Sequence, residues 1–217
     1  MKFDRTKKID LIITAAIFII GSILSYWLKL KPLMVFIVAL IPPSVYLCLR
    51  ERKNFKKLIV ATLIFGAVFG FIFDFIVTYN LGWIVADLVI PYRIFGFYPV
   101  DDIFGFMIMT FAIVVFYEHF LDEYRSRKIS PHLQRALLLS LVVLTVIVSL
   151  YLINSAFLEI PYVYLITGLL AIIIPVHISV AKPRFINRFI KITLPFFFVW
   201  FVIEIICLKT GGWFFPG

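Results

Sequence analysis

Seven stretches of mostly apolar residues run along the chain, separated by short polar segments. An α-helix rises 1.5 Å per residue, so about 20 residues cross the roughly 30 Å hydrocarbon core of a bilayer. The seven stretches cover residues 9–28, 32–49, 57–79, 101–121, 134–153, 161–180 and 188–208. The second contains Pro42 and Pro43 and is predicted to be kinked, because neighbouring helices can satisfy the carbonyls that proline frees. The pattern predicts an all-α polytopic membrane bundle of about seven transmembrane helices.

Composition and charge support a membrane protein. The chain is 63% hydrophobic, whereas soluble domains are roughly 45–50% apolar. Its net charge of +9 is gathered in short basic clusters between the apolar stretches, a pattern that orients helices in a bilayer and does not indicate nucleic-acid binding. We therefore expect a multi-pass protein of the cell membrane with the lipid bilayer as its surroundings.

The basic residues also predict the orientation. Seventeen of the 21 Lys and Arg residues lie before the first span or in the connections between spans two and three, four and five, and six and seven. Only Lys29, Lys31, Arg93 and Lys209 lie on the opposite side. The positive-inside rule then puts the N-terminus in the cytoplasm and the C-terminus outside.

One motif occurs twice. Asp74 and Glu204 are each followed, after seven intervening residues, by Gly-Trp, and the two copies are 130 residues apart. Weaker matches at offsets of 129 to 133 predict a tandem duplication within one membrane domain, residues 1–217. Repeat 1 covers about 1–124, and repeat 2 covers about 130–217 without a counterpart of the last helix of repeat 1. Parallel repeats of this kind pack around an axis normal to the bilayer, with sites often at their interface.

The carboxyl groups are the candidate chemistry. A carboxyl within a membrane helix is costly, so Asp74 and Glu204 are candidates for one functional site. Pro99-Val100-Asp101-Asp102 opens the next helix at a similar depth, in the outer half of the bundle. As alternatives, Asp101 and Asp102 can be capping carboxylates, and Asp74 and Glu204 structural partners of a Thr, Tyr or Trp donor.

Other polar and small residues have simpler interpretations. Gly66, Gly70 and Asp74 share a helix face that is expected to point into the bundle, where the glycines allow close packing. The acidic residues and histidine at the cytoplasmic end of the fourth span are expected to be interfacial; they are Glu118, His119, Asp122 and Glu123. Phosphate-binding glycine loops and metal-ligand spacings are not found, so no cofactor and no metal site are predicted.

From Asp74 through Trp83 to the Pro99–Asp102 motif, the chain resembles the membrane-embedded lycopene cyclases of the heterodimeric or fused type. That family carries tandem copies of an acid, an aromatic residue and a Pro-x-Glu-Glu motif. Here Asp replaces both Glu, Glu204 and Trp213 resemble the second copy, and the second Pro-x-Glu-Glu helix is absent. The resemblance implies an isomerase that cyclises the end group of a linear carotenoid or related isoprenoid without net redox change. It also implies a homo- or heterodimer with a second membrane subunit.

The chemistry suits carboxyl groups among aromatic rings. A protonated carboxyl protonates a terminal alkene, the carbocation closes a ring, and a base removes a neighbouring proton. We expect Asp74 or Glu204 as the acid and Asp101 or Asp102 as the base or proton-network partner. The predicted substrate-binding residues are Trp83, Phe97, Pro99, Phe104, Trp200 and Trp213. The aromatic faces among them, such as those of Trp83, Phe97, Phe104 and Trp200, can stabilise the cation by about 0.5–2 kcal/mol. The alternatives are a non-catalytic prenyl-lipid binding subunit and a proton-coupled transporter.

Overall fold

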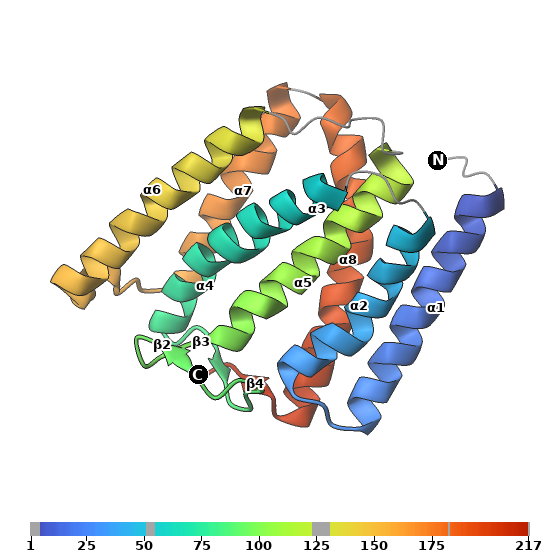
Figure 1. Cartoon of the computed structure of the whole chain (residues 1–217). Coiled ribbons are helices and arrows are strands. Elements are labelled where there is room, and N and C mark those ends of the chain that lie inside the picture. The colour runs from blue at the N-terminus through green and yellow to red at the C-terminus, as the bar shows by residue number, and fades with distance from the viewer. Residues whose placement is uncertain (1–4, 51–54, 123–130, 182, 217) are drawn as a thin grey trace.

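The computed structural model describes residues 5–50, 55–122, 131–181 and 183–216; no side chain is described for residues 131, 132, 174, 175, 178, 179, 181 and 183–185. Long helices dominate the described chain (Figure 1). The helical elements before the first strand are α1 (Arg5–Trp27), α2 (Pro32–Arg50), α3 (Phe55–Ala61), η1 (Thr62–Phe69) and α4 (Gly70–Tyr79). Those that follow are α5 (Val100–Tyr117), η2 (Glu118–Asp122), α6 (Pro131–Ile153), η3 (Ser155–Leu158), α7 (Val163–Ala181) and α8 (Pro183–Thr210).

The all-α prediction is confirmed, and so are six of the seven predicted spans. Helices α1, α2, α6 and α8, the continuous helix formed by α3, η1 and α4, and the continuous helix formed by α5 and η2 are long and apolar enough to cross a membrane. Helix α7 runs from Val163 to Ala181, but its side chains are described without a gap only over Val163–Ile173, so the sixth predicted span stays a prediction. The chain runs through Pro42 and Pro43 within one helix, α2.

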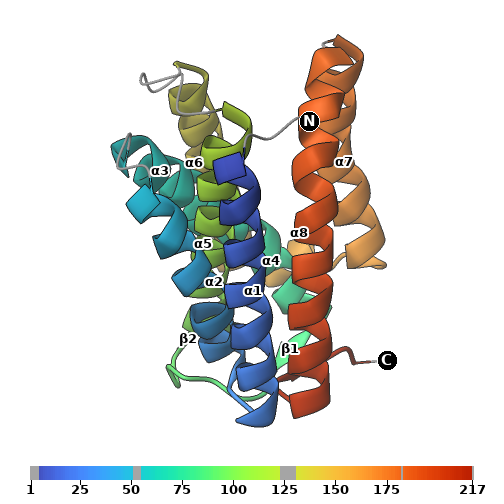
Figure 2. The same cartoon turned by 90° about the vertical axis from the view of Figure 1, so that its right-hand side faces the viewer.

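Successive long helices run in alternating directions, so the chain returns repeatedly to the same two ends of the bundle (Figures 1 and 2). Helix α1 packs on α2, α2 packs on α5, and α5 packs on η1 and α4. Helices α7 and α8 pair with each other beside this group (Figure 2). The arrangement places the start of α1 and the start of α8 at one end and the C-terminal segment at the other.

Two glycines explain why α5 lies so close to the third span. A Cβ atom added at Gly66 would lie 2.8 Å from the backbone Cα of Met107, and one added at Gly70 would lie 2.9 Å from Cβ of Phe106. The backbones approach closely because neither glycine has a side chain. The predicted packing face of Gly66 and Gly70 is thus confirmed, and Asp74 continues it into the bundle with no exposed surface.

Four two-residue strands lie at the end of the bundle where the C-terminal segment is found, and they form two short two-stranded sheets. Strands β2 (Arg93–Ile94) and β3 (Tyr98–Pro99) pair within the connection from α4 to α5. Strand β1 (Ile84–Val85) pairs antiparallel with β4 (Trp213–Phe214), so the two Gly-Trp segments of the chain lie side by side. The register matches Val85 with Trp213 and Ile84 with Phe214.

A candidate carboxyl and tryptophan site

The C-termini of α4 and α8 have the same local structure, 130 residues apart. The backbone N–H of Gly82 donates to the carbonyl of Val77 at 2.9 Å, and that of Gly212 donates to the carbonyl of Cys207 at 2.8 Å. The residue before each glycine is left-handed, Leu81 with φ 54° and Gly211 with φ 73°. Such helix ends reverse the chain direction, and here each brings a tryptophan back beside the helix that it follows.

At the first of these ends a hydrogen-bonded relay joins Trp83 to Asp74. The indole Nε1–H of Trp83 donates to the Thr78 hydroxyl at 3.2 Å, and that hydroxyl donates to Asp74 Oδ1 at 3.3 Å. Thr78 can relay because it lies one helical turn after Asp74. At the second end the contact is direct, since the indole Nε1–H of Trp213 donates to Glu204 Oε1 at 3.2 Å.

Asp102 and Tyr98 lie beside Asp74. Burial raises the pKa of the Tyr98 hydroxyl, and the negative charges of Asp74 and Asp102 raise it further. Asp74 Oδ2, Asp102 Oδ2 and the Tyr98 hydroxyl are buried, and none has a hydrogen-bond partner among the described residues. Within the same part of the chain neither carboxyl forms an ion pair. The arrangement therefore places two adjacent carboxyls and a phenol in one buried group, where they interact with one another.

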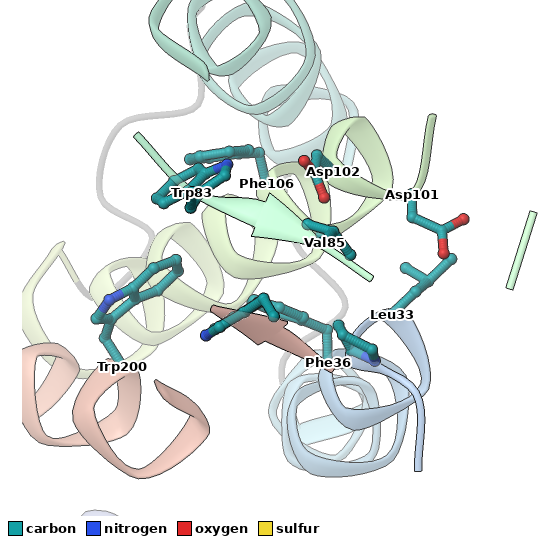
Figure 3. A pocket seen from close by; sticks show the side chains of 11 residues that line it. Leu33, Phe36, Trp83, Val85, Asp101, Asp102, Phe106 and Trp200 are labelled. Carbon is teal, nitrogen blue, oxygen red and sulfur yellow. The ribbon is translucent and has the colours of Figure 1, made fainter. Parts of the chain in front are cut away.

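Asp101 has a different environment from Asp102, its neighbour in sequence. Its carboxylate accepts the backbone N–H of Val89 at 2.6 Å and that of Ile90 at 3.0 Å. Asp101 thereby fixes the loop between α4 and α5 to the start of α5, and each of its carboxylate oxygens accepts one of these hydrogen bonds. Asp101 therefore does not cap α5, because the two N–H groups that it binds belong to the preceding loop and not to the first turn of the helix. Figure 3 shows the carboxyl groups of Asp101 and Asp102 pointing in different directions.

A small pocket lies between the two Gly-Trp segments (Figure 3). Its volume is about 30 Å³, and it lies where β1 and β4 pair. The lining residues are Pro32, Leu33, Phe36, Trp83, Val85, Asp101, Asp102, Gly105, Phe106, Trp200 and Trp213. Trp200 stacks on Trp213 with ring centroids 6.4 Å apart, and Phe36 packs against both indoles. The pocket is thus an aromatic enclosure with the carboxyl of Asp102 at its wall.

The structure brings together some of the predicted site residues and separates others. Of the predicted set, Trp83, Asp101, Asp102, Trp200 and Trp213 line the pocket. Asp74 and Glu204 do not line the pocket. Glu204 accepts a hydrogen bond from Trp213, and Asp74 is linked to Trp83 through the Thr78 hydroxyl, so each acid is connected to a tryptophan that does line it.

The other predicted substrate-binding residues lie outside the pocket lining. Phe97 packs on Phe75 with ring centroids 5.0 Å apart, in a separate aromatic cluster. Pro99 is buried immediately before α5, and the side chain of Phe104 is exposed.

Sequence reasoning missed several residues of this site. Thr78 had a detectable signal, since a hydroxyl four residues after a buried acid lies on the same helix face. Tyr98, Phe36 and Tyr164 had none. Tyr164 of α7 contacts Trp83 at 5.9 Å and Phe215 at 6.0 Å between ring centroids, so it spans the two Gly-Trp segments.

A second polar cluster was only partly anticipated, at the opposite end of the bundle. Asp10 of α1 is buried; its carboxylate accepts from Tyr46 at 2.7 Å and Arg50 at 2.9 Å and lies 3.1 Å from His119 Nε2. Lys57 forms an ion pair with Glu118, and Asp122 lies 3.6 Å from Lys57. Glu118 and His119 are buried, whereas Glu123 lies outside the described residues. These contacts join α1, α2, α3 and η2, so the cluster holds the helices together at this end.

The fold defines a class: the chain is a multi-pass integral membrane protein, and the carboxyl of Asp74 is fully buried within it. Within the described residues no three His, Cys, Asp or Glu side chains are grouped as metal ligands. Comparisons with protein-family models, with curated proteins and with solved structures found no match.

Proposed function

We propose that the protein is a lycopene cyclase-like membrane isomerase that closes a ring at the end of a linear carotenoid or related isoprenoid. The observation that carries the proposal is the buried group of Asp74, Asp102 and Tyr98 next to the tryptophan-lined pocket. Proton-initiated cyclisation needs an acid, a base and electron-rich walls, in a site without water that would capture the cation. Asp74, Asp102 and the indoles of Trp83, Trp200 and Trp213 are of the required types.

The proposed reaction moves one proton in and one proton out. The sequence suggested Asp74 or Glu204 as the acid, but neither lines the pocket, so we assign this role to Asp102. Its carboxyl transfers a proton to the terminal alkene, and a tertiary carbocation forms. The electrons of a second double bond in the chain then form the new carbon–carbon bond of a six-membered ring. A proton leaves the neighbouring carbon for a carboxylate, and the product is an isomer of the substrate. Asp74, held by Thr78 and lying beside Asp102, exchanges protons with it.

Aromatic rings would hold the intermediate. The indoles of Trp83, Trp200 and Trp213 line the pocket, and cation–π contacts contribute about 0.5–2 kcal/mol each. The volume of about 30 Å³ is room for about one water molecule, so the site must widen around an end group. Because Trp200 and Trp213 both belong to the C-terminal segment, movement of α8 is the proposed way to widen it.

The matching ends of α4 and α8 support the proposed tandem repeat, in which Glu204 and Trp213 are the counterparts of Asp74 and Trp83. The antiparallel pairing of β1 with β4 would then be the point where the two copies meet. The positive-inside rule supports a cytoplasmic N-terminus and places this site in the outer half of the membrane.

The test is pigment chromatography of a lycopene-accumulating bacterial host that expresses the chain. We expect monocyclic or bicyclic carotenoids with the wild-type protein, and their loss with Asp102→Asn and with Asp74→Asn at equal membrane expression. Asp87→Asn is the matched control, because Asp87 is exposed and pairs with Lys31. Full activity of both asparagine variants at the site would contradict the assignment of the carboxyls.

A second candidate function is that of a non-catalytic subunit that binds a prenyl lipid. Its support is the extensive apolar surface of α6, α7 and α8, which a second membrane subunit could cover. Unchanged lycopene, with the protein verified in the membrane, would favour this function over catalysis.

A further inference from the structure

A larger cavity lies in the other half of the bundle, between α8 and the group formed by α1, α2 and α5. Its volume is about 520 Å³, within the usual range of ligand sites. The lining residues are Leu11, Thr14, Ala15, Phe18, Ile19, Leu40, Pro43, Ser44, Leu47, Ala112, Phe116, Leu121, Lys191, Pro195, Phe196, Phe198, Val199 and Val202. From Lys191 to Val202 the cavity follows α8 for about 16 Å at 1.5 Å per residue. The lining thus extends along about three turns of α8.

Its interior offers almost no polar group to a ligand. The Thr14 hydroxyl donates to the carbonyl of Asp10 at 2.7 Å, and the Ser44 hydroxyl donates to the carbonyl of Leu40 at 2.7 Å. Both hydroxyls are therefore occupied by the backbone of their own helices. The remaining lining is hydrocarbon and aromatic, apart from one end.

Lys191 is the one charged residue of the lining, and it lies at the end nearest the start of α8. Its side chain is half-buried, and within the described part of the chain it forms no hydrogen bond and no ion pair. A cation at an apolar cavity is costly unless an anion accompanies it. A second polar group lies at this place. Proline has no N–H, so Pro195 cannot donate the helical hydrogen bond to the carbonyl of Lys191, four residues earlier.

The surroundings of Lys191 add positive charge. Arg188 lies one turn earlier on the same face of α8 and is exposed, and its guanidinium lies 3.5 Å from the Tyr117 hydroxyl. On α1, Lys8 is exposed one turn before Leu11 of the lining. The apolar cavity therefore has a cationic rim at one end, and its charge pattern is complementary to an amphiphile with an anionic head.

We propose that the cavity binds one acyl chain of an anionic phospholipid, with its phosphate paired to Lys191. The chain lies along α8 from Lys191 towards Val202 and fills the space lined by Phe18, Leu40 and Ala112. The phosphate supplies the anion that Lys191 lacks within the described residues. The occupant joins α8 to α1, α2 and α5, and its binding needs no reaction at the carboxyl site.

The experiment is native mass spectrometry of the full chain, purified in detergent and supplied with equal amounts of phosphatidylglycerol and phosphatidylcholine. We expect one retained phosphatidylglycerol, with at least a tenfold preference over phosphatidylcholine. Lys191→Gln should abolish the preference, and Ala112→Phe, which fills the cavity, should abolish retention of both lipids. Lys209→Gln is the matched control, because Lys209 is exposed near the other end of the same helix.

The variants distinguish head-group pairing from simple filling of the cavity. Equal retention of both lipids by the wild-type chain would overturn the proposal by showing a site for any apolar chain. An unchanged preference in Lys191→Gln would overturn it as well. A mass that corresponds to two copies of the chain without lipid would identify the occupant as a second protomer. If Ala112→Phe fails to fold, Ala15→Phe on α1 replaces it and must give the same loss.

Discussion

At the residue scale, the four carboxyls that the sequence groups together have three different environments, because Asp74 and Asp102 share one. Asp101 is bonded through both oxygens to backbone N–H groups and is a closing element of its loop. Asp102 keeps a buried oxygen without a partner among the described residues, next to Asp74 and Tyr98. Glu204 is half-buried and bonded only to Trp213 in that part of the chain. Of these groups, Asp102 both lines the pocket and lies beside Asp74.

Replacing Thr78 tests whether the relay from Trp83 positions Asp74. Thr78→Val removes the hydroxyl and leaves the indole N–H of Trp83 and Asp74 Oδ1 without their partner. Loss of a buried partner costs about 1–3 kcal/mol, so we expect cyclisation to fall about tenfold to hundredfold. Initial rates of ring formation in membranes measure this.

Thr78→Ser should restore most of the activity, because it restores the hydroxyl. Thr167→Val in α7 is the matched control, since that buried hydroxyl donates to the carbonyl of Val163. Equal activity of Thr78→Val and the wild-type chain would show that Asp74 is positioned without the relay.

At the element scale, close packing and helix ends position the site. Gly66 and Gly70 let α5 approach η1 and α4, which brings Asp102 beside Asp74. The left-handed residues Leu81 and Gly211 then turn the chain so that each Gly-Trp segment returns to the bundle. The pocket exists because β1 and β4, which follow these turns, pair with each other.

Gly66→Ala tests the close approach of the helices. The added Cβ would lie 2.8 Å from Met107 Cα, which is backbone and cannot rotate away, so α5 must move. We expect a loss of about 1–3 kcal/mol in the free energy of unfolding, the usual cost of overpacking. Unfolding in mixed detergent, followed by circular dichroism, measures it.

Gly168→Ala in α7 is the control, because a Cβ atom there has no neighbour within 4 Å. That change should be neutral or stabilising by up to about 1 kcal/mol, since alanine favours a helix over glycine. A Gly66→Ala protein as stable as the Gly168→Ala protein would contradict the packing argument.

At the scale of the whole molecule, the alternating helices separate two polar regions. The cluster of Asp10, Arg50 and His119 joins helices at one end, and the carboxyl and tryptophan site lies at the other. The large cavity lies on the side of the first cluster. The predicted orientation puts that cluster and the cavity in the cytoplasmic half of the bilayer.

Cysteine labelling of intact cells tests this orientation. With Cys48→Ala as the background, Lys209→Cys should react with a membrane-impermeant maleimide added outside, because Lys209 is exposed near the C-terminal end. Lys8→Cys should react only after the cells are permeabilised. Cys207 is buried and should contribute no signal in either case. Labelling of Lys8→Cys from outside would reverse the orientation and the assignment of the leaflets.

The sequence by itself determined the long helices of this protein, and the tertiary structure decided which residues meet and where the short strands pair. Hydrophobic length is a local property, so the ends of the described helices fall within five residues of the predicted spans. The repeated Gly-Trp motif was likewise visible, because its spacing lies within one segment. The contacts of Tyr98 with Asp74, of Tyr164 with Trp83 and of Asp10 with His119 join residues that are far apart in the chain. Asp101 and Asp102 are adjacent and chemically identical in the sequence, so only the packing could show that Asp101 binds the preceding loop whereas Asp102 lies beside Asp74.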